Sequence, residues 1–248
     1  MTWLAPGESF PSLAQAWGPT DPAPGLLAAG GALDVETLRG AYAQAIFPWF
    51  SEGQPILWWS PHPRMVLQTD AFRMHRSLRK TLEHFRRSAP RCEIRIDTAF
   101  AEVIRACAAS PREGQSGTWI VPEMVQAYLA LHRAGQAHSV ETWVDGQLAG
   151  GLYCVAIGKA VFGESMFTRV TDGSKIALAA LVAFCRHHGI RAIDCQQNTP
   201  HLAFMGAREM SRADFAAHVA QHRLEPSPTW RFEPVYWNEV LTPRPTAA

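Results

Sequence analysis

The sequence predicts an α+β protein in which a small, aromatic-rich N-terminal domain precedes a larger domain with a mixed, mostly antiparallel sheet. Residues 1–63 carry proline, glycine and tryptophan in quick succession, which indicates a small rigid domain of turns and short extended segments. After residue 64, segments with a helical period occur beside three consecutive strand-like segments, an order typical of helices packed on a mixed sheet. We therefore expect domains at 1–63 and 64–237, followed by a proline-rich, frayed tail at 238–248.

The composition sets wide limits on function. The chain has 248 residues, 47% of them hydrophobic, with 23 basic and 22 acidic side chains, so its overall charge neither requires nor excludes a nucleic-acid partner. No apolar run has the length of a membrane span, and the first residues lack the features of a signal peptide. The five cysteines lack metal-type spacing, which favours structural thiols in a reduced, cytoplasmic protein.

The first helix is expected at 34–45, with Asp34 as its N-cap, and the rest of the N-terminal domain as turns and short extended pieces. A short strand follows at 65–68. Two amphipathic helices come next, the first capped by Ser77 and the second by Asp97. Their apolar positions predict one buried face on each helix.

The following helix should begin at Pro122 and end at Gly135, because proline suits a first helical position and glycine suits a helix end. Beyond it the hydrophobic period changes from helix-like to strand-like. Turn signals at 145–146 and 158–159 then predict a three-stranded antiparallel meander.

The last elements are a helix from Ser174 to Gly189, a strand at 190–196, and a helix near 211–222. Alternate side chains of a strand point to the same face. Asp194 and Gln196 would therefore share one face of this strand, where an acid and an amide side by side are unexpected in an apolar setting. The neighbouring Cys195 would point away, and packing explains a buried free cysteine better than nucleophilic chemistry does.

A basic cluster lies on and beside the helix that begins near Ser77. It allows two interpretations: an ordinary solvated helix face, or a surface that contacts RNA phosphates. Its members are Arg73, Arg76, Arg79, Lys80, Arg86, Arg87 and Arg91.

Three further side chains have open interpretations. Trp49 and Trp119 lie next to turns rich in glycine or proline, where a tryptophan either packs in the core or stacks on a nucleic-acid base. Glu164 lies among apolar neighbours and is either paired structurally or offered to a cationic substrate group. Of the histidines, only His138 and His201 flank the strands of interest, and no common catalytic or nucleotide-binding motif occurs.

Several linked motifs nevertheless closely resemble one family. The segments "GLLAAGGAL", "AYAQAIFPWFSEGQPILWWSPHPR", "GTWI", "HSVETW", "GLYCVAIGKAVFGESMF", "SKIAL" and "IDCQ" occur here in the order and spacing of the leucyl/phenylalanyl-tRNA–protein transferase family. The similarity runs from about residue 10 to about residue 237.

This resemblance implies an aminoacyltransferase that moves Leu or Phe, and also Met, from aminoacyl-tRNA to proteins with N-terminal Arg or Lys. The added residue marks the acceptor protein for degradation in bacteria. The resemblance also implies a C-terminal domain similar to GNAT (acyl-CoA N-acyltransferase) folds, with no metal and no dissociable cofactor. We expect a cytoplasmic monomer.

The resemblance also implies roles for individual residues. Asp194 and Gln196 match the catalytic pair, and Trp49 and Trp119 match aromatics that hold the terminal adenosine of the tRNA. The aminoacyl pocket would be formed by Glu164, Met166, Leu178, Leu181 and Ile193. The candidates for tRNA backbone contact come from the basic cluster: Arg76, Arg79, Lys80, Arg86 and Arg87.

Three positions depart from the family pattern. Thr199 stands where an asparagine is expected, Phe204 where a small residue is expected, and Phe162 lies one place after the expected pocket aromatic, at Val161. These departures concern the outline of the pocket and the preference between Leu and Phe. They leave the class of reaction unchanged.

A carboxamide has no useful basicity near neutral pH, so we do not expect Gln196 to remove a proton by itself. Our hypothesis at this point is that Gln196 orients the acceptor amine while Asp194 stabilises its charge.

Two alternatives remain open from the residues. An acyl-CoA N-acyltransferase of the GNAT type would carry a glycine-rich pyrophosphate loop, whereas the corresponding "TRVTDGSKIAL" has one glycine. A non-catalytic tRNA-binding protein would use the basic cluster and the aromatics, but it would need neither "IDCQ" nor "GESMF".

Overall fold

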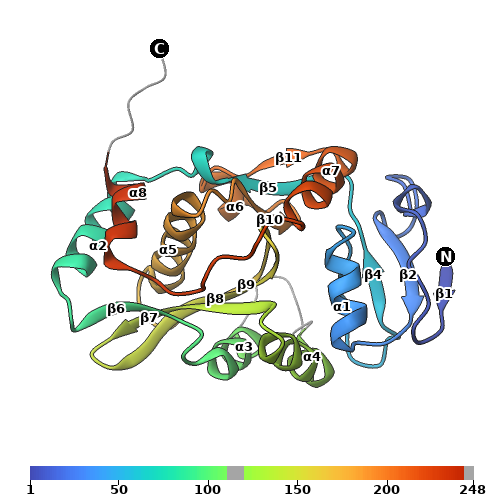
Figure 1. Ribbon diagram of the computed structural model, residues 1–248, viewed down its shortest axis with the longest axis horizontal. Helices are drawn as coiled ribbons and strands as arrows, with labels where there is room; N and C mark the ends of the chain where they lie inside the picture. The colour runs from blue at the N-terminus through green and yellow to red at the C-terminus, as the bar shows by residue number, and fades with distance from the viewer. Residues whose placement is uncertain (111–119, 243–248) are drawn as a thin grey trace, which may run out of the picture.

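The computed structural model describes residues 1–110 and 120–242, which form two sheets and their covering helices (Figure 1). A four-stranded sheet has the order β1-β2-β4-β3, and a seven-stranded sheet has the order β11-β5-β10-β9-β8-β7-β6. The first contains β1 (Thr2–Leu4), β2 (Leu26–Gly30), β3 (Phe47–Pro48) and β4 (Leu57–Trp59). The second contains β5 (Arg64–Gln68), β6 (Cys92–Ile96), β7 (Ala137–Val144), β8 (Gln147–Ile157), β9 (Ala160–Thr168), β10 (Ala192–Gln196) and β11 (Arg208–Met210).

The helices surround the larger sheet, apart from α1, which belongs to the N-terminal part. They are α1 (Val35–Tyr42), α2 (Arg76–Arg87), α3 (Phe100–Ala109), α4 (Pro122–Arg133), α5 (Gly173–His187), α6 (Pro200–Phe204), α7 (Arg212–His222) and α8 (Asn238–Leu241). No helix within residues 1–110 and 120–242 is long and apolar enough to span a membrane.

The predicted meander is confirmed. Strands β7, β8 and β9 pair in antiparallel order, and both hairpins turn at the expected positions. The first turn has positive φ at Asp145 (50°) and Gly146 (73°), as a tight two-residue hairpin requires. Of the pairs in this sheet only β9 with β10 is parallel, so the sheet is mixed and mostly antiparallel, as the sequence predicts. The short edge strands β6 and β11 were not predicted.

Helices cover both faces of the larger sheet. Alternate residues of β8 show this arrangement: Tyr153 and Val155 belong to the core under α3 and α4, whereas Leu152 and Cys154 belong to the core under α5 and α2. In Figure 1, α5 lies above β8 and β9 while α3 and α4 lie below them. The strand pair β9–β10 thus runs between two packed layers, which is why side chains on its two faces have different environments.

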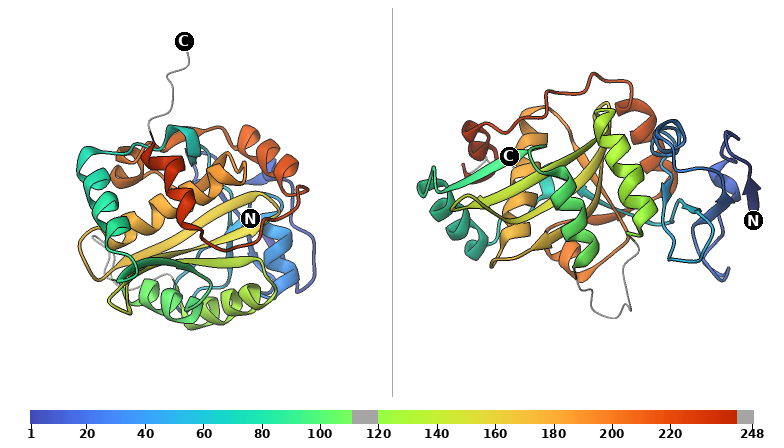
Figure 2. Two further views of the ribbon diagram at one scale, coloured as in Figure 1. Left: turned by 60° about the vertical axis from the view of Figure 1, so that its left-hand side comes forward. Right: turned by 90° about the horizontal axis from the view of Figure 1, so that it is seen from below.

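The four-stranded sheet lies at one end of the molecule (Figure 2, right). Its helix α1 begins after Asp34, whose Oδ1 accepts a hydrogen bond from the Thr37 N–H at 2.8 Å, so the predicted N-cap is confirmed. The helix ends at Tyr42, three residues earlier than expected, because Ala45 has a left-handed φ of 63°. Tyr42 is fully buried in the same core as Tyr128 of α4, so the two sheets are joined by apolar packing.

Three predicted N-caps are wrong. Helix α2 is preceded by His75 rather than Ser77, α3 by Ala99 rather than Asp97, and α5 by Asp172 rather than Ser174. None of the three observed caps accepts a side-chain hydrogen bond. The predicted ends are confirmed: α4 begins at Pro122, and left-handed glycines at 135 and 189 follow α4 and α5.

The start of α5 is fixed by backbone packing instead of a side-chain cap. A Cβ atom on Gly150 would lie 2.6 Å from the carbonyl carbon of Gly173, so only glycine allows β8 to approach the helix so closely. Correspondingly, Asp97 is used elsewhere, where it accepts a hydrogen bond from the Ser139 N–H at 2.8 Å.

The end of the described chain also differs from the prediction. Residues 238–241 form α8, and Val240 is buried in the core that contains α5. The expected frayed tail therefore does not begin directly after Trp237. Residues 243–248 lie outside the described part of the chain.

Candidate active site

A cavity of about 320 Å³ opens where β9 and β10 meet α5 and the segment that contains α6. Its walls come from β8, β9, β10, α5, the residue that follows α3 and the residues after β10. They are Ser110, Leu152, Tyr153, Gly163, Glu164, Ser165, Met166, Leu178, Leu181, Ile193, Asp194, Cys195, Thr199, His201 and Leu202. Most of the lining surface is apolar and several polar side chains interrupt it, which is the usual composition of a small-molecule site.

The structure brings together every residue expected in the aminoacyl pocket. Met166 lies on β9, Leu178 and Leu181 lie on α5, and Ile193 lies on β10, and all four line the cavity together with Glu164. These side chains come from three elements, so their gathering depends on the β9–β10 pairing and on α5 packing over it.

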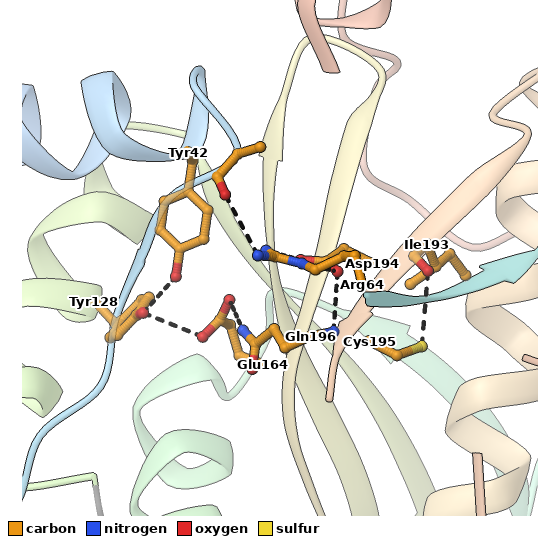
Figure 3. Close-up of polar contacts among 9 residues, drawn as sticks. Tyr42, Arg64, Tyr128, Glu164, Ile193, Asp194, Cys195 and Gln196 are labelled. Atoms are coloured by element: carbon orange, nitrogen blue, oxygen red, sulfur yellow. Dashed lines mark hydrogen bonds and ion pairs between the residues drawn. The ribbon is translucent and has the colours of Figure 1, made fainter. Parts of the chain in front are cut away.

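Asp194 is fully buried and is held by Arg64 of β5 (Figure 3). The arginine Nε donates to Oδ1 at 2.8 Å and Nη2 donates to Oδ2 at 2.6 Å. The guanidinium is 1% exposed, lies 4.7 Å from the ring centres of Phe47 and Phe215, and donates through Nη1 to the Ala45 carbonyl at 3.3 Å. Buried charges require this kind of complete pairing.

The same carboxylate also positions Gln196. Its Oδ1 accepts the Gln196 backbone N–H at 2.9 Å, at a point where the pairing of β10 with β5 is irregular. Gln196 has a φ of 61°, a left-handed conformation that is costly for a residue other than glycine or asparagine. Asp194 thus supplies a hydrogen bond that this strained backbone would otherwise lack.

The side chain of Gln196 reaches Glu164 and that of Asp194 reaches Arg64, while Cys195 points the other way (Figure 3), in agreement with strand alternation. The expected direct contact between the Asp194 carboxylate and a substrate amine does not fit this geometry. Both carboxylate oxygens are already engaged by Arg64, and the side chain has no exposed surface. Its remaining contact at the site is with the backbone N–H of Gln196.

Glu164 links the cavity to a buried pair of tyrosines. Its Oε1 accepts Gln196 Nε2 at 3.0 Å, and its Oε2 accepts the Tyr128 hydroxyl at 3.2 Å. The Tyr128 and Tyr42 hydroxyl oxygens are 2.5 Å apart, so a chain of polar groups runs from Gln196 to α1. Glu164 is therefore structurally paired, and it also lines the cavity.

Burial raises the pKa of Glu164 to about 7, and the charge of Asp194 adds to this, while hydrogen bonds from Tyr42, Tyr128 and Gln196 act in the opposite direction. Burial and the nearby Glu164 also raise the pKa values of Tyr42 and Tyr128 well above the usual range. Near neutral pH, the two phenols are therefore protonated, and Glu164 is divided between its neutral and charged forms.

Cys195 lines the cavity but is not a nucleophile at neutral pH. Burial raises its pKa to about 12, and its thiol lies 3.7 Å from the Ile193 carbonyl oxygen. The thiolate, not the thiol, attacks carbonyl carbons, so this residue contributes packing.

The two histidines noted in the sequence lie in different environments. His201 lines the cavity, and burial, with a contribution from Lys175, lowers its pKa below the usual range. His138 pairs with Asp97 at 2.7 Å and stacks on Trp230 instead of lining the cavity.

Of the two tryptophans expected to hold adenosine, Trp49 is absent from the cavity lining. Trp49 is half-buried, packs edge-on against Trp59 with ring centres 5.4 Å apart, and accepts the Trp59 indole N–H through its carbonyl at 2.7 Å. Trp119 lies outside the described residues.

The basic cluster does not present all its charges equally. Arg76, Lys80, Arg86 and Arg87 are exposed on α2, opposite the buried Leu78, Leu82 and Phe85. Arg79 is half-buried and donates to the Leu241 carbonyl at 2.6 Å, and Arg91 forms a bidentate pair with Asp145. The expectation of one shared solvent face is therefore wrong for Arg79.

The departures from the family pattern have local explanations. Thr199 caps α6 by accepting the Leu202 N–H at 3.2 Å, and it also lines the cavity. Phe162 is fully buried between Tyr42 and Phe215 and is absent from the lining, whereas Phe204 is 55% exposed.

Three residues of the site were not found from the sequence: Arg64, Tyr42 and Tyr128. The tyrosines fall on helix faces that the apolar pattern assigns to the core, which hides their hydroxyl groups from such reasoning. Arg64 is the first residue of an apolar strand. This position is the one feature of the local sequence that could have indicated its role, because an arginine there must find a buried partner.

Two family models and many curated proteins of one family match this chain. The family model for "Leucyl/phenylalanyl-tRNA protein transferase" matches residues 66–220, and the model for the N-terminal domain of the same family matches residues 31–62. A leucyl/phenylalanyl-tRNA–protein transferase of Polaromonas sp. (strain JS666) is 67% identical over 240 residues, covering 97% of this chain and 94% of the relative. One from Albidiferax ferrireducens is 64% identical, covering 98% and 95%. Among solved structures, FemX aligns with a TM-score of 0.45 at 11% identity over 71% of this chain and 66% of that chain.

Proposed function

The chain belongs to the leucyl/phenylalanyl-tRNA–protein transferase family, and we propose that the cavity beside Gln196 is where it transfers an apolar amino acid from aminoacyl-tRNA to a protein. The observation that carries this proposal is the meeting of an apolar cavity with a fixed polar pair, Glu164 and Gln196. An aminoacyl ester needs both: a pocket for its side chain, and groups that orient an incoming amine at its carbonyl.

The lining favours medium-sized apolar side chains. Met166, Leu178, Leu181 and Ile193 offer no polar partner to an aminoacyl side chain, so selection relies on burial and shape. One methylene group contributes only about 1–3 kcal/mol to discrimination in such pockets. Leu, Phe and Met are the donors that fit this chemistry.

Gln196 orients the acceptor amine. Its Nε2 donates to Glu164, and this hydrogen bond fixes the plane of the carboxamide, so its Oε1 is available to accept from an amine N–H. The amine nitrogen forms a bond to the ester carbonyl carbon, and the bond from that carbon to the tRNA ribose oxygen breaks. The proton that the nitrogen loses ends on the released ribose hydroxyl, so the transfer needs no net acid or base. Holding the amine at the ester is a gain of orientation.

The acceptor proteins carry N-terminal Arg or Lys, and the transferred residue marks them for degradation. Glu164 supports a cationic acceptor, because its charged form places a carboxylate in the cavity lining that would attract an ammonium or guanidinium group. Asp194 is already neutralised by Arg64. We also propose that the enzyme acts as a monomer in the cytoplasm.

The tRNA itself would contact the exposed side of α2. Arg76, Lys80, Arg86 and Arg87 are free to reach phosphates, and the contribution of Arg79 is reduced by its hydrogen bond to Leu241. Trp49 and Trp119 are proposed to hold the terminal adenosine.

The test uses radiolabelled Leu-tRNA, the purified enzyme and a model protein with N-terminal Arg, with an N-terminal Met version as control. Label on the Arg protein alone supports the proposal. The Asp194→Ala variant should lose transfer, and Gln196→Gly, which suits the left-handed backbone, should lose it while remaining folded. Absence of label with wild-type enzyme, while tRNA still binds, would instead indicate a tRNA-binding protein without this activity.

A further inference from the structure

Phe204 and His75 form an exposed aromatic stack outside the cavity. Their ring centres are 3.8 Å apart with an interplanar angle of 10°, and His75 Nε2 lies 2.9 Å from the Phe204 carbonyl oxygen. Phe204 is the last residue of α6, and His75 directly precedes α2, so the two helix ends meet at this stack. Phe204 remains 55% exposed despite the contact.

An exposed phenylalanine ring forgoes part of the stabilisation that its complete burial would give. The other face of α6 explains why it lies outward. Leu202 lines the cavity, and two residues further along a helix is a rotation of about 200°, so Phe204 faces away from the cavity wall. The short helix α6 thus separates the cavity from the Phe204–His75 stack.

The surroundings of the stack are basic. Arg73 and Arg76 flank His75 and are exposed, and the first turn of α2 contains no acidic residue. The Arg73 N–H donates to the Met205 carbonyl at 2.9 Å, and the close approach of its side chain to Gly206 keeps it beside the end of α6. Lys80 extends the exposed charge along the helix.

We propose that the Phe204–His75 stack holds an unpaired base of the tRNA while Arg73 and Arg76 contact the adjacent phosphates. A base presents a flat π-surface to an exposed ring, and phosphates follow basic side chains, a combination typical of single-stranded nucleic-acid sites. An acceptor protein with a cationic N-terminus would be repelled by the same arginines. This inference rests on the proposed function, because it assigns the base to the donor tRNA.

Stacking on one aromatic side chain is worth about 1–3 kcal/mol per base, which corresponds to roughly 5- to 150-fold in affinity. The experiment compares two donors with wild-type enzyme and variants: full Leu-tRNA, and the leucyl ester of adenosine, which lacks every other nucleotide. Phe204→Leu removes the ring and keeps an apolar side chain, and Phe204→Tyr keeps the ring. Leu224→Ser is the matched control for loss of an exposed apolar side chain, since Leu224 is 79% exposed.

The expected result is a KM for Leu-tRNA that is about 5-fold higher or more in Phe204→Leu, with kcat unchanged and with the adenosine ester unaffected. Phe204→Tyr should restore the wild-type KM, and Leu224→Ser should leave both donors unchanged. Because stacking adds no ion contact, Phe204→Leu should weaken the affinity for uncharged tRNA without changing the slope of log K against log salt.

Three results would overturn the inference. Equal losses on both donors would show that the substitution acts through α6 on the cavity. A raised KM for the acceptor protein alone would make the stack an acceptor contact, and no change on either donor would leave it without a role in binding. If wild-type enzyme transfers from neither donor, the proposed function fails, and the binding of uncharged tRNA by Phe204→Leu still decides the stacking claim.

Discussion

Arg64 and Asp194 are separated by 130 residues, yet they form a bidentate ion pair that is almost completely buried, with donor–acceptor distances of 2.8 and 2.6 Å. The pair joins β5 to β10 at the position where Asp194 Oδ1 also accepts the Gln196 N–H. Because Gln196 in turn bonds to Glu164, the geometry at the cavity depends on an arginine that does not line it.

Replacing Arg64 by methionine should destabilise the protein by about 3–5 kcal/mol, because it leaves the Asp194 carboxylate buried without a partner. Transfer activity should be abolished with it. Chemical denaturation followed by circular dichroism measures the first effect, and the labelled-transfer assay measures the second.

The double variant Arg64→Met with Asp194→Leu separates folding from function. Replacing both members of a buried ion pair by apolar residues is often neutral or stabilising, so the double variant should regain most of the stability of the wild type. It should remain inactive, because the Gln196 N–H then has no carboxylate acceptor. Regained activity in this variant would show that the ion pair does not position Gln196.

Glu164 should make the stability of the protein depend on pH. Its pKa is raised from 4.5 in the unfolded chain to about 7 in the fold, so ionisation is less favourable in the folded state. The stability contributed by the neutral carboxyl is complete below about pH 4.5 and is lost as the pH rises to about 7. The loss is on the order of 3 kcal/mol, and Glu164→Gln, which stays neutral, should not show it.

Paired unfolding curves of wild type and Glu164→Gln between about pH 5 and 8 test this expectation. As the pH rises, the wild type should lose unfolding free energy relative to Glu164→Gln. Parallel curves throughout this range would mean that Glu164 has an ordinary pKa. In transfer assays the acceptor amine also titrates near about pH 8, so only the difference between the two enzymes reports on Glu164.

The sequence predicts the elements of this fold better than it predicts the contacts of the site. The meander and the ends of α4 and α5 follow from local patterns, because turns and apolar periods are properties of short segments. The wall residues Met166 and Leu178 were expected only from the family resemblance. The predicted N-caps Ser77 and Ser174 are wrong. At α5 the reason is that backbone packing of Gly150 against Gly173 sets the start of the helix.

The pairing of Arg64 with Asp194 could not be read from either segment. Each lies on a strand whose neighbours are decided by topology, and most of the larger domain lies between β5 and β10 in the sequence. The left-handed φ of Gln196 is likewise invisible in "IDCQ", since glutamine carries no preference for that conformation. For this reason the contacts of Asp194 with Arg64 and with the Gln196 N–H could not be foreseen from the sequence.

Gln196 offers a variant that keeps the backbone and removes the side chain. Gln196→Gly should be more stable than Gln196→Ala by about 1 kcal/mol, because the left-handed conformation is strained for alanine and not for glycine. Both should reduce transfer activity to a similar extent, at least about 10-fold in kcat, because both lack the carboxamide. Denaturation curves and single-turnover transfer rates measure the two effects. If Gln196→Gly instead kept nearly the wild-type transfer rate while the less stable Gln196→Ala lost activity, the carboxamide would have no part in the mechanism.

The size of the cavity should set the preference between donors. Leu181→Ala enlarges the wall formed by α5, so the ratio of kcat/KM for Phe-tRNA to that for Leu-tRNA should rise by about 10-fold or more. Competition between the two labelled donors gives this ratio directly. Val182, also fully buried on α5 but absent from the lining, provides the control, since Val182→Ala should lower stability without changing the ratio.

Exposed basic side chains of α2 that form no ion pair within the protein should contribute to tRNA affinity. Substituting Arg76 or Lys80 by glutamine should weaken tRNA binding and make the slope of log K against log salt less steep by roughly one for each phosphate that is no longer neutralised. Arg91→Gln is the control, because Arg91 is paired with Asp145 and should affect neither quantity. Filter binding of tRNA between about 50 and 200 mM salt covers the range in which such slopes are measurable. If Arg76→Gln and Lys80→Gln match wild type at every salt concentration while Arg91→Gln does not, the tRNA lies elsewhere and α2 is an ordinary solvated helix.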